Sequence, residues 1–198
     1  MREPDMQSAP ENLMSACRRW LGEVDRVDAA LYTAVAGTPT PALDQSMRRL
    51  SHAANYSRLS IASAALLALA GGETGRRAAM VGLASVAVTA TIVNLAVKPL
   101  SRRRRPDRAA EQVPLNRQVR MPISTSFPSG HSAAAFAFAT GVGSVMPTAA
   151  LPLRVLAGLV AYSRVHTGVH YPGDVIGGSL MGAALAQVTA RALDRRQG

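Results

Sequence analysis

The sequence predicts an all-α protein, a membrane helical bundle with about five apolar helices and an amphipathic helix in front of them. Two uncharged apolar stretches, 79–97 and 132–153, come close to the roughly 20 residues that a membrane-spanning helix needs. They are rich in Ala, Gly and Ser, which allow helices to pack closely in a bilayer. No segment shows the sustained alternation of a strand. The mean hydropathy is only +0.10, so a soluble bundle of buried helices is the alternative.

The N-terminal part is expected to form an amphipathic helical region over residues 12–55, after a disordered tail over residues 1–11. Apolar residues recur at helical spacing from Leu13 onward, and Asn12 is a suitable N-cap for that helix. The sequence Gly37-Thr-Pro-Thr-Pro41 should end it. A second amphipathic stretch follows over about 42–54 and leads into the first apolar helix.

The five apolar helices are expected within one domain, residues 56–193, followed by a short tail over 194–198. Pro99 disfavours helical geometry at the residue before it, so the second apolar helix should end at 97. Pro147 should stop the third helix, and Asp174 should cap the fifth. The expected spans are 56–70, 79–97, 130–146, 151–164 and 175–193.

Composition limits the partners of this chain. The net charge is +10 and aromatic residues make up only 4%. Because most long uncharged stretches are apolar, the basic charge indicates anionic lipid or a phosphorylated substrate rather than nucleic acid. The single cysteine excludes an internal disulfide. The polar first dozen residues do not resemble a cleavable signal peptide, so membrane insertion would depend on internal segments.

Three short motifs carry the residues capable of chemistry. They supply fixed cations, a tight turn at a helix start, two imidazoles and one carboxylate, a set that suits holding a phosphate and attacking its phosphorus. If helices two to five cross a membrane, all three motifs emerge on one side. They read Lys98-Pro-Leu-Ser-Arg-Arg-Arg-Arg105-Pro106, then Pro128-Ser129-Gly130-His131, then Ser163-Arg164-Val-His-Thr-Gly-Val-His170-Tyr-Pro-Gly-Asp174.

This pattern, K-x6-RP, PSGH and SR-x5-H-x3-D, resembles the signature of the type 2 phosphatidic acid phosphatase (PAP2) superfamily. The order and internal spacing of its defining positions agree with that signature. The motifs span residues 98–174, and apolar segments flank them on both sides as in membrane members of the family. The first 58 residues carry none of the signature.

The resemblance implies a role for each motif residue. His170 would be the nucleophile that forms a phosphohistidine, and Asp174 would hydrogen-bond the other ring nitrogen. His131 would protonate the leaving alkoxide and then activate water. The phosphate would be bound by the cations and by the start of the third apolar helix, that is by Lys98, Arg105, Ser129, Gly130 and Arg164.

Other polar residues near the motifs are expected to play smaller parts. Charge alone leaves the register of the arginine run ambiguous, and Pro106 with the spacing from Lys98 selects Arg105. We therefore interpret 102–104 as ordinary juxtamembrane charge. His166 falls at a free position of the third motif and is interpreted as structural or as a support for the site. No metal site or cofactor is expected, because no carboxylate cluster has metal-ligand spacing.

The implied function is that of a metal-independent lipid phosphate phosphatase acting on a phosphatidate-type or polyprenyl-linked phosphate. The chain is similar to the short bacterial members of the family, which include decaprenylphosphoryl-5-phosphoribose phosphatases. The alternatives are a vanadate-dependent haloperoxidase-like enzyme and a non-catalytic lipid-phosphate-binding membrane protein. Non-motif arginines are more numerous at the motif end, so a multi-pass protein of the bacterial inner membrane with a cytoplasmic active site is expected.

Overall fold

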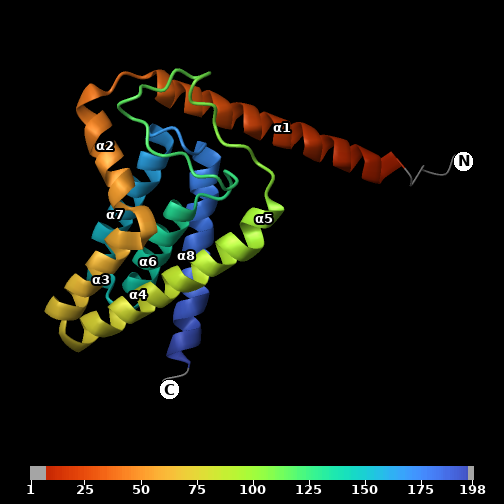
Figure 1. Ribbon diagram of the computed structural model, residues 1–198. Coiled ribbons are helices and arrows are strands. Elements are labelled where there is room, and N and C mark those ends of the chain that lie inside the picture. The colour runs from red at the N-terminus through yellow and green to blue at the C-terminus, as the bar shows by residue number, and fades with distance from the viewer. Residues whose placement is uncertain (1–7, 196–198) are drawn as a thin grey trace, which may run out of the picture.

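All the regular structure in the described part of the chain, residues 8–195 of the computed structural model, is helical (Figure 1). The predicted all-helical class is confirmed. The elements are α1 (Ser8–Gly37), α2 (Pro41–Ala53), a 3₁₀ turn η1 (Asn55–Ser57), α3 (Arg58–Ala70), α4 (Gly72–Ile92), a π-helical turn η2 (Val93–Val97), α5 (Lys98–Leu100), α6 (Gly130–Val145), α7 (Pro147–His166) and α8 (Pro172–Asp194).

Helix α6 lies in the middle of the bundle and packs against α4, α7 and α8. Small residues let these helices approach closely. A Cβ on Gly82 of α4 would lie 2.8 Å from the Phe138 ring, and a Cβ on Gly182 of α8 would lie 2.1 Å from the carbonyl oxygen of Ala133. The Ala- and Gly-rich composition of the apolar stretches is therefore what permits this packing.

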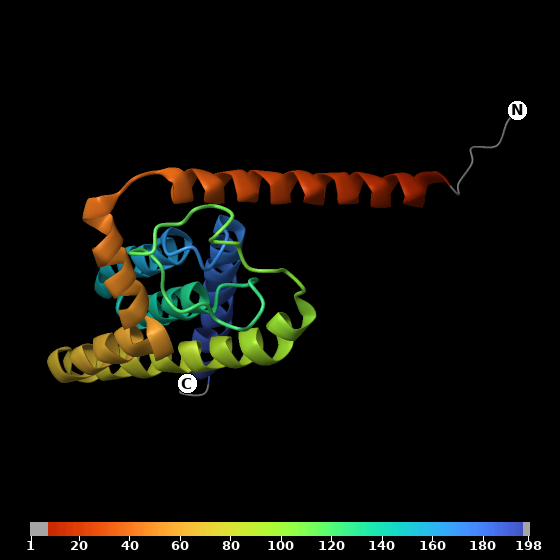
Figure 2. The same ribbon diagram turned by 45° about the horizontal axis from the view of Figure 1, so that its top comes forward.

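Helix α1 crosses the end of the bundle at which the α7–α8 connection lies (Figures 1 and 2). Its C-terminal half contacts α7 and α8 and buries Tyr32 and Ala36, whereas Trp20 and Val24 are exposed. The helix begins at Ser8, so the expected start after Asn12 was wrong, as was disorder over residues 8–11. The rest of the expected N-terminal tail lies outside the described residues.

Several predicted boundaries were wrong for local reasons. The second apolar helix passes Lys98 and ends at Leu100, because a π-helical turn precedes Pro99 and Ser101 N closes onto the Val97 and Lys98 carbonyls. Residues 71–78 were expected to form a loop between the first two apolar helices. Instead α4 begins at Gly72, so all of them except residue 71 are helical. Pro147 opens α7 instead of only ending α6, as the first turn of a helix tolerates proline.

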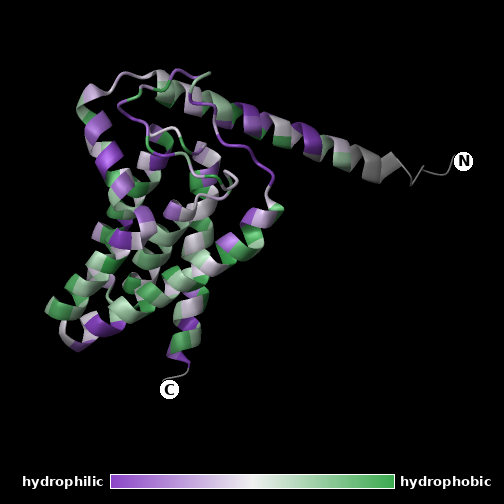
Figure 3. Cartoon of the chain, in the orientation of Figure 1, coloured by the Kyte–Doolittle hydropathy of each residue, from purple (hydrophilic) through white to green (hydrophobic). Residues whose placement is uncertain are grey.

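One continuous helical stretch in the described residues, Gly72–Leu100, is long and apolar enough to cross a membrane, with 29 residues and a mean hydropathy of 2.0 over its best window. The other described helices do not meet that length and hydropathy test. Figure 3 shows hydrophobic residues along α3, α4 and α6, and hydrophilic ones on α1, α2 and the connection after α5.

The long connection from Ser101 to Ser129 is irregular but anchored by a buried ion pair. Arg117 is 1% exposed, and its Nε donates to Asp44 Oδ1 of α2 at 2.7 Å. Its Nη2 donates to the carbonyl of Thr38 just after α1 at 2.7 Å. His166 Nε2 lies 3.3 Å from the same Asp44 oxygen. The pair thereby holds the connection against α1, α2 and α7, and His166 serves this packing.

Candidate active site

The α7–α8 connection presents the predicted nucleophile. Gly168 has a φ of +72°, and a Cβ there would lie 2.9 Å from Arg108 and 3.0 Å from the Tyr32 hydroxyl, so glycine suits this turn. Two residues later His170 is 2% exposed. Its Nε2 lies 3.2 Å from Arg105 Nη1, and its Nδ1 lies 3.5 Å from Asp174 Oδ2. The second distance is slightly longer than a normal hydrogen bond.

Burial lowers the pKa of His170 to about 4. The neighbouring Asp174 opposes this shift, and the positive charges of Arg105 and Arg164 add to it. The imidazole is therefore neutral at pH 7, with a lone pair on one ring nitrogen. Asp174 favours a proton on Nδ1, so Nε2 is the nitrogen free to react.

Asp174 is fully buried and is held from several directions. It lies at the third position of α8, where its Oδ2 accepts from the Tyr171 amide at 2.9 Å in a capping box. It was predicted to be the N-cap itself, but that position belongs to Tyr171 because Pro172 already opens the helix. The Ser126 hydroxyl also donates to Oδ2, and Arg103 Nη1 donates to Oδ1 at 2.9 Å.

Arg103 was interpreted from the sequence as ordinary juxtamembrane charge, and that interpretation was wrong. It is paired at once with Asp174 and with Asp28 of α1, and its guanidinium lies 4.6 Å from the centre of the Tyr171 ring. Arg103 falls at a free position of the first motif, so the spacing of the motifs does not select it. The partner that distinguishes it from Arg102 and Arg104 lies 75 positions earlier in the sequence.

The predicted phosphate-binding cations line the same end of the bundle. Arg105 is fixed by carbonyl groups, with 2.8 Å to Ser124 O and 2.7 Å to Val169 O. Lys98 Nζ lies 3.5 Å from the Ser124 hydroxyl and would lie 3.4 Å from a Cβ on Gly130. The amine thus faces the first turn of α6, where amide groups without intrahelical acceptors suit an anion.

Ser129 is the N-cap of α6, and its hydroxyl accepts from the Ser132 amide at 3.5 Å. Its own amide donates to the Asp174 carbonyl at 2.9 Å. The start of α6 is therefore tied directly to the start of α8. This tie brings the second and third motifs together.

The remaining predicted residues, His131 and Arg164, are held by residues that sequence reasoning did not find. Asn55 Oδ1 lies 2.9 Å from His131 Nε2. Arg164 is 2% exposed, and its Nη1 donates to Ser51 Oγ at 2.5 Å. Both partners lie outside the motifs and carried no signal in the sequence. His131 is also within electrostatic reach of other motif residues, namely Arg164, His170, Lys98 and Arg105.

A cavity of about 190 Å³ opens beside this cluster, between η1, α4 and α6. Lys98, Gly130 and His131 line it together with Thr89 of α4 and with Val93 and Asn94 of η2. Its lining therefore combines residues of the first motif and of the second motif.

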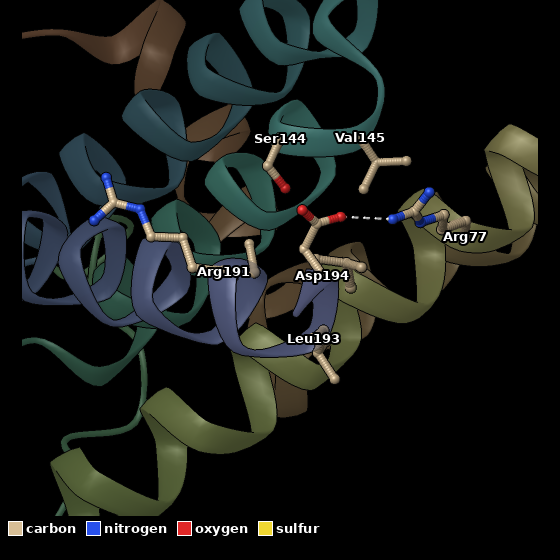
Figure 4. A pocket seen from close by; sticks show the side chains of 8 residues that line it. Arg77, Ser144, Val145, Arg191, Leu193 and Asp194 are labelled. Atoms are coloured by element: carbon tan, nitrogen blue, oxygen red, sulfur yellow. Dashed lines mark hydrogen bonds and ion pairs between the residues drawn. The ribbon is translucent and has the colours of Figure 1, made fainter. Parts of the chain in front are cut away.

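Another cavity, of about 320 Å³, lies near the C-terminal end of α8 (Figure 4). None of its lining residues belongs to a motif. Arg77 pairs there with Asp194 at 2.9 Å, as Figure 4 shows, and the Ser144 hydroxyl donates to the Gly141 carbonyl. The chemistry of the motifs is therefore at the other end of the bundle.

The fold is a helical bundle. The predicted site residues at one of its ends are two histidines, one buried carboxylate and three cations, a set that suits the binding of a phosphate. The PAP2 superfamily matches residues 78–197, which is more than half of the chain. The chain belongs to the PAP2 superfamily.

Two similar proteins share one name. The chain is 33% identical over 158 residues to the decaprenylphosphoryl-5-phosphoribose phosphatase of Mycolicibacterium smegmatis, covering 78% of this chain and 80% of that protein. It is 38% identical over 103 residues to the Mycobacterium tuberculosis H37Rv protein of that name, covering 52% of this chain. The latter match spans 54% of the relative, about half its length.

A solved structure supports the fold. The transmembrane PAP2-type phosphatidylglycerolphosphate phosphatase from Bacillus subtilis superposes with a TM-score of 0.66 at 25% identity, covering 88% of this chain and 87% of that one. The arrangement of helices in this chain is thus similar to that of a transmembrane member of the family.

Proposed function

We propose that this protein is an integral membrane, metal-independent phosphatase that hydrolyses a lipid phosphate through a phosphohistidine intermediate. The observation that carries the proposal is the placement of His170. One ring nitrogen lies 3.2 Å from a guanidinium that would hold the phosphate, and the other lies 3.5 Å from a buried carboxylate. A neutral imidazole between a phosphate-binding cation and a carboxylate is placed to act as a nucleophile.

In the first step the phosphate sits among Lys98, Arg105 and Arg164, with its oxygens toward the start of α6. His170 Nε2 attacks phosphorus, so a P–N bond forms while the P–O bond to the alcohol breaks. The proton on Nδ1 stays, and Asp174 stabilises the positive ring. His131 gives its proton to the leaving oxygen.

In the second step a water molecule attacks the phosphorus and His131 takes its proton. The P–N bond breaks, inorganic phosphate leaves, and His170 is regenerated. The charge of the phosphate is balanced by fixed side chains and amide groups. Within the described residues no three His, Cys, Asp or Glu side chains gather as a metal-binding group.

The cavity beside His131 is the proposed place of the leaving alcohol. It is smaller than the roughly 300–1,000 Å³ of sites for drug-sized ligands. It therefore suits the small alcohol group next to the phosphate, with the hydrocarbon chain continuing outside the bundle. Thr89 and Asn94 give it polar groups among apolar ones, which suits a hydroxylated alcohol such as a sugar.

Apolar side chains on the outside of the bundle support the membrane location. They project from three helices around it and lie outside the stretch Gly72–Leu100, the one among the described residues that passes the length and hydropathy test. A multi-pass protein whose catalytic end lies at the membrane surface would cover them with lipid. They are Ile61, Leu66 and Leu69 on α3, Leu151, Val155 and Leu159 on α7, and Ile176, Leu180 and Val188 on α8.

Among lipid phosphates, we infer that a polyprenyl-phosphoryl sugar phosphate is the preferred substrate. The small, partly polar cavity favours it, as does the likeness to relatives named for such a substrate. Phosphate release by the detergent-purified protein tests this against phosphatidate, phosphatidylglycerol phosphate and polyprenyl diphosphate. We expect kcat/KM to be at least about tenfold higher for the sugar phosphate, a difference of about 1.4 kcal/mol.

The same assay tests the chemistry. Orthovanadate, which adopts the five-coordinate geometry of the transferring phosphorus, should inhibit, and EDTA should leave turnover unchanged. Release from none of the four lipids would refute the phosphatase, and faster release from phosphatidate would refute only the substrate preference.

A further inference from the structure

A carboxylate from α1 reaches the catalytic end of the bundle. Asp28 is 6% exposed, and both of its oxygens are used. Oδ2 lies 2.5 Å from Arg103 Nη2, and Oδ1 accepts from the Gly173 amide at 2.6 Å. Both contacts are to neighbours of Asp174. Arg103 also donates to the Asp174 carboxylate, and Gly173 precedes Asp174 in the first turn of α8.

Arg103 connects the two carboxylates. Its Nη1 donates to Asp174 Oδ1 at 2.9 Å, while the other terminal nitrogen is held by Asp28. A guanidinium is a planar fork, so fixing one terminal nitrogen also fixes the direction of the other. The Asp174 oxygen that faces His170 is Oδ2. That oxygen accepts from the Tyr171 amide and the Ser126 hydroxyl, and the contact of Arg103 with Oδ1 also helps to set the plane of the carboxylate.

We propose that Asp28 is a positioning residue for the phosphatase reaction, acting through Arg103 and Gly173 to hold Asp174 against His170. This proposal rests on the proposed function. It makes the N-terminal helix a part of the catalytic apparatus, although α1 lies wholly before the residues that match the family, 78–197.

The surroundings of Asp28 leave no substitute for it. Asp25, one turn earlier on α1, lies 3.2 Å from the same Arg103 nitrogen, but its side chain is 71% exposed. An exposed carboxylate holds a cation weakly because solvent screens it. The approach of Asp28 to the α8 start is also close, since a Cβ on Gly173 would lie 2.8 Å from Asp28 Oδ2. Only glycine at 173 leaves room for this contact.

The test compares Asp28→Asn with Asp25→Asn in the full-length, detergent-purified protein. Both changes remove one negative charge from α1 next to the same arginine, so the second is a matched control. With the lipid phosphate that the wild type turns over fastest, Asp28→Asn should lower kcat at least about tenfold, as loss of a supporting contact to a catalytic group typically does. The KM should change less than about twofold, and Asp25→Asn should stay within about twofold of wild type in both.

Two further measurements separate positioning from a merely structural effect. The inhibition constant for orthovanadate should stay within about twofold in Asp28→Asn, because the phosphate-binding cations are untouched. In the Arg103→Gln background, Asp28→Asn should cause a smaller loss of kcat than in the wild-type background, because the part of its effect that acts through Arg103 is already gone and only the Gly173 contact is left to lose. If Asp28→Asn does not fold, Arg103→Gln carries the test with the same expected loss of kcat and unchanged vanadate inhibition.

Equal kcat values for Asp28→Asn and Asp25→Asn would overturn the proposal. So would additive losses in the double variant, or a loss that appears wholly in vanadate inhibition. A wild-type protein that releases phosphate from no lipid would instead overturn the proposed function, so the two failures are distinguishable.

Discussion

The helices from α4 to α8 and the N-terminal segment from α1 to η1 serve one site in different ways. The residues with proposed chemical roles all lie between Lys98 and Asp174 and belong to three motifs. The N-terminal segment contains no motif residue, yet Asp28, Ser51 and Asn55 each contact a motif residue or its anchor. The proposed reacting groups thus come from one part of the sequence, whereas the groups that hold them come from both parts.

A motif therefore identifies the reacting atoms and leaves the residues that hold them unspecified. A nucleophile or a phosphate-binding cation must be one of a few residue types, so it leaves a pattern. A support needs only a hydrogen-bonding atom at the right place, which many residues and many sequence positions can provide. Substitutions in the two regions should therefore differ in size and in kind.

The largest effect should come from the nucleophile. His170→Ala removes the atom that bonds to phosphorus, so kcat should fall by ~10⁴-fold or more, as when a triad nucleophile is lost. The protein should stay folded and still bind orthovanadate weakly through its cations. Phosphate release and vanadate binding by the purified variant measure both. Turnover close to that of the wild type would remove the covalent mechanism.

The second effect should depend on the substrate. His131→Ala removes the proton donor for the leaving oxygen, so hydrolysis of an alkyl phosphate should fall by ~10²–10⁴-fold. An acidic leaving group such as p-nitrophenol needs little protonation, so its loss should be much smaller. Rates with both substrates decide this, and equal losses would argue against a role as general acid.

The third prediction concerns acid pH. The pKa of His170 is lowered from about 6.5 to about 4, so the folded protein keeps the neutral nucleophile down to about pH 4. Below that, kcat/KM should fall about tenfold per pH unit. Because the unfolded chain takes up this proton more readily, stability should also fall as pH drops from about 6.5 to 4. Titration of the ring by NMR in detergent tests this; a midpoint near 6.5 would contradict it.

Much of the fold could be predicted from the sequence, because the periodicity of apolar residues within a segment and the length of its apolar run both indicate a helix. The prediction failed where one local rule competed with another. Pro99 was expected to end a helix before Lys98, but a π-helical turn accommodates it. Pro147 was expected to stop a helix and also starts the next one. The apolar segments expected to be helices are helical, whereas the expected loop before the second of them belongs to α4 and the exact helix ends depended on packing.

For the candidate site, the sequence proposes the motif residues but does not reveal the residues that contact them, among them Arg103, Ser51 and Asn55. Arg103 looks like its neighbours Arg102 and Arg104 in the sequence, and only the tertiary contact with Asp28 distinguishes it. Ser51 is one of many serines, and its contact with Arg164 joins positions 113 residues apart. Such pairings are fixed by helix packing and leave no local pattern.

The fourth prediction measures a support in the N-terminal segment. Ser51→Ala leaves the buried Arg164 without its 2.5 Å acceptor. A hydrogen bond to a charged group contributes about 1.5–3 kcal/mol, so KM should rise by roughly ten- to a hundredfold if that loss falls on phosphate binding. Ser60→Ala, a change of another buried serine, is the control. Equal KM values for both variants would show that Ser51 does not support the phosphate site.

The last prediction concerns the face of the membrane on which the motifs and α1 lie. The variants that test it should keep wild-type activity. After Arg103 and Arg117 are set aside because they pair with carboxylates inside the protein, arginines still favour the motif end. Among the described residues, those at the motif end include Arg48, Arg49, Arg58, Arg102, Arg104, Arg108 and Arg120, and those toward the other end are Arg76, Arg77, Arg154, Arg191 and Arg195. Positive charge stays on the cytoplasmic side, so we propose a cytoplasmic active site.

Single cysteines in a protein whose native Cys17 is replaced by serine test this proposal. Leu115 is 83% exposed on the long connection at the motif end, and Arg76 is exposed near the start of α4. In intact cells, an impermeant thiol reagent should label Arg76→Cys and spare Leu115→Cys, and both variants should retain wild-type turnover. Labelling of Leu115→Cys with protection of Arg76→Cys would place the motifs and α1 on the outer face. The arginine excess would then serve phosphate binding rather than orientation, because charges recruited to a substrate need not follow the positive-inside rule.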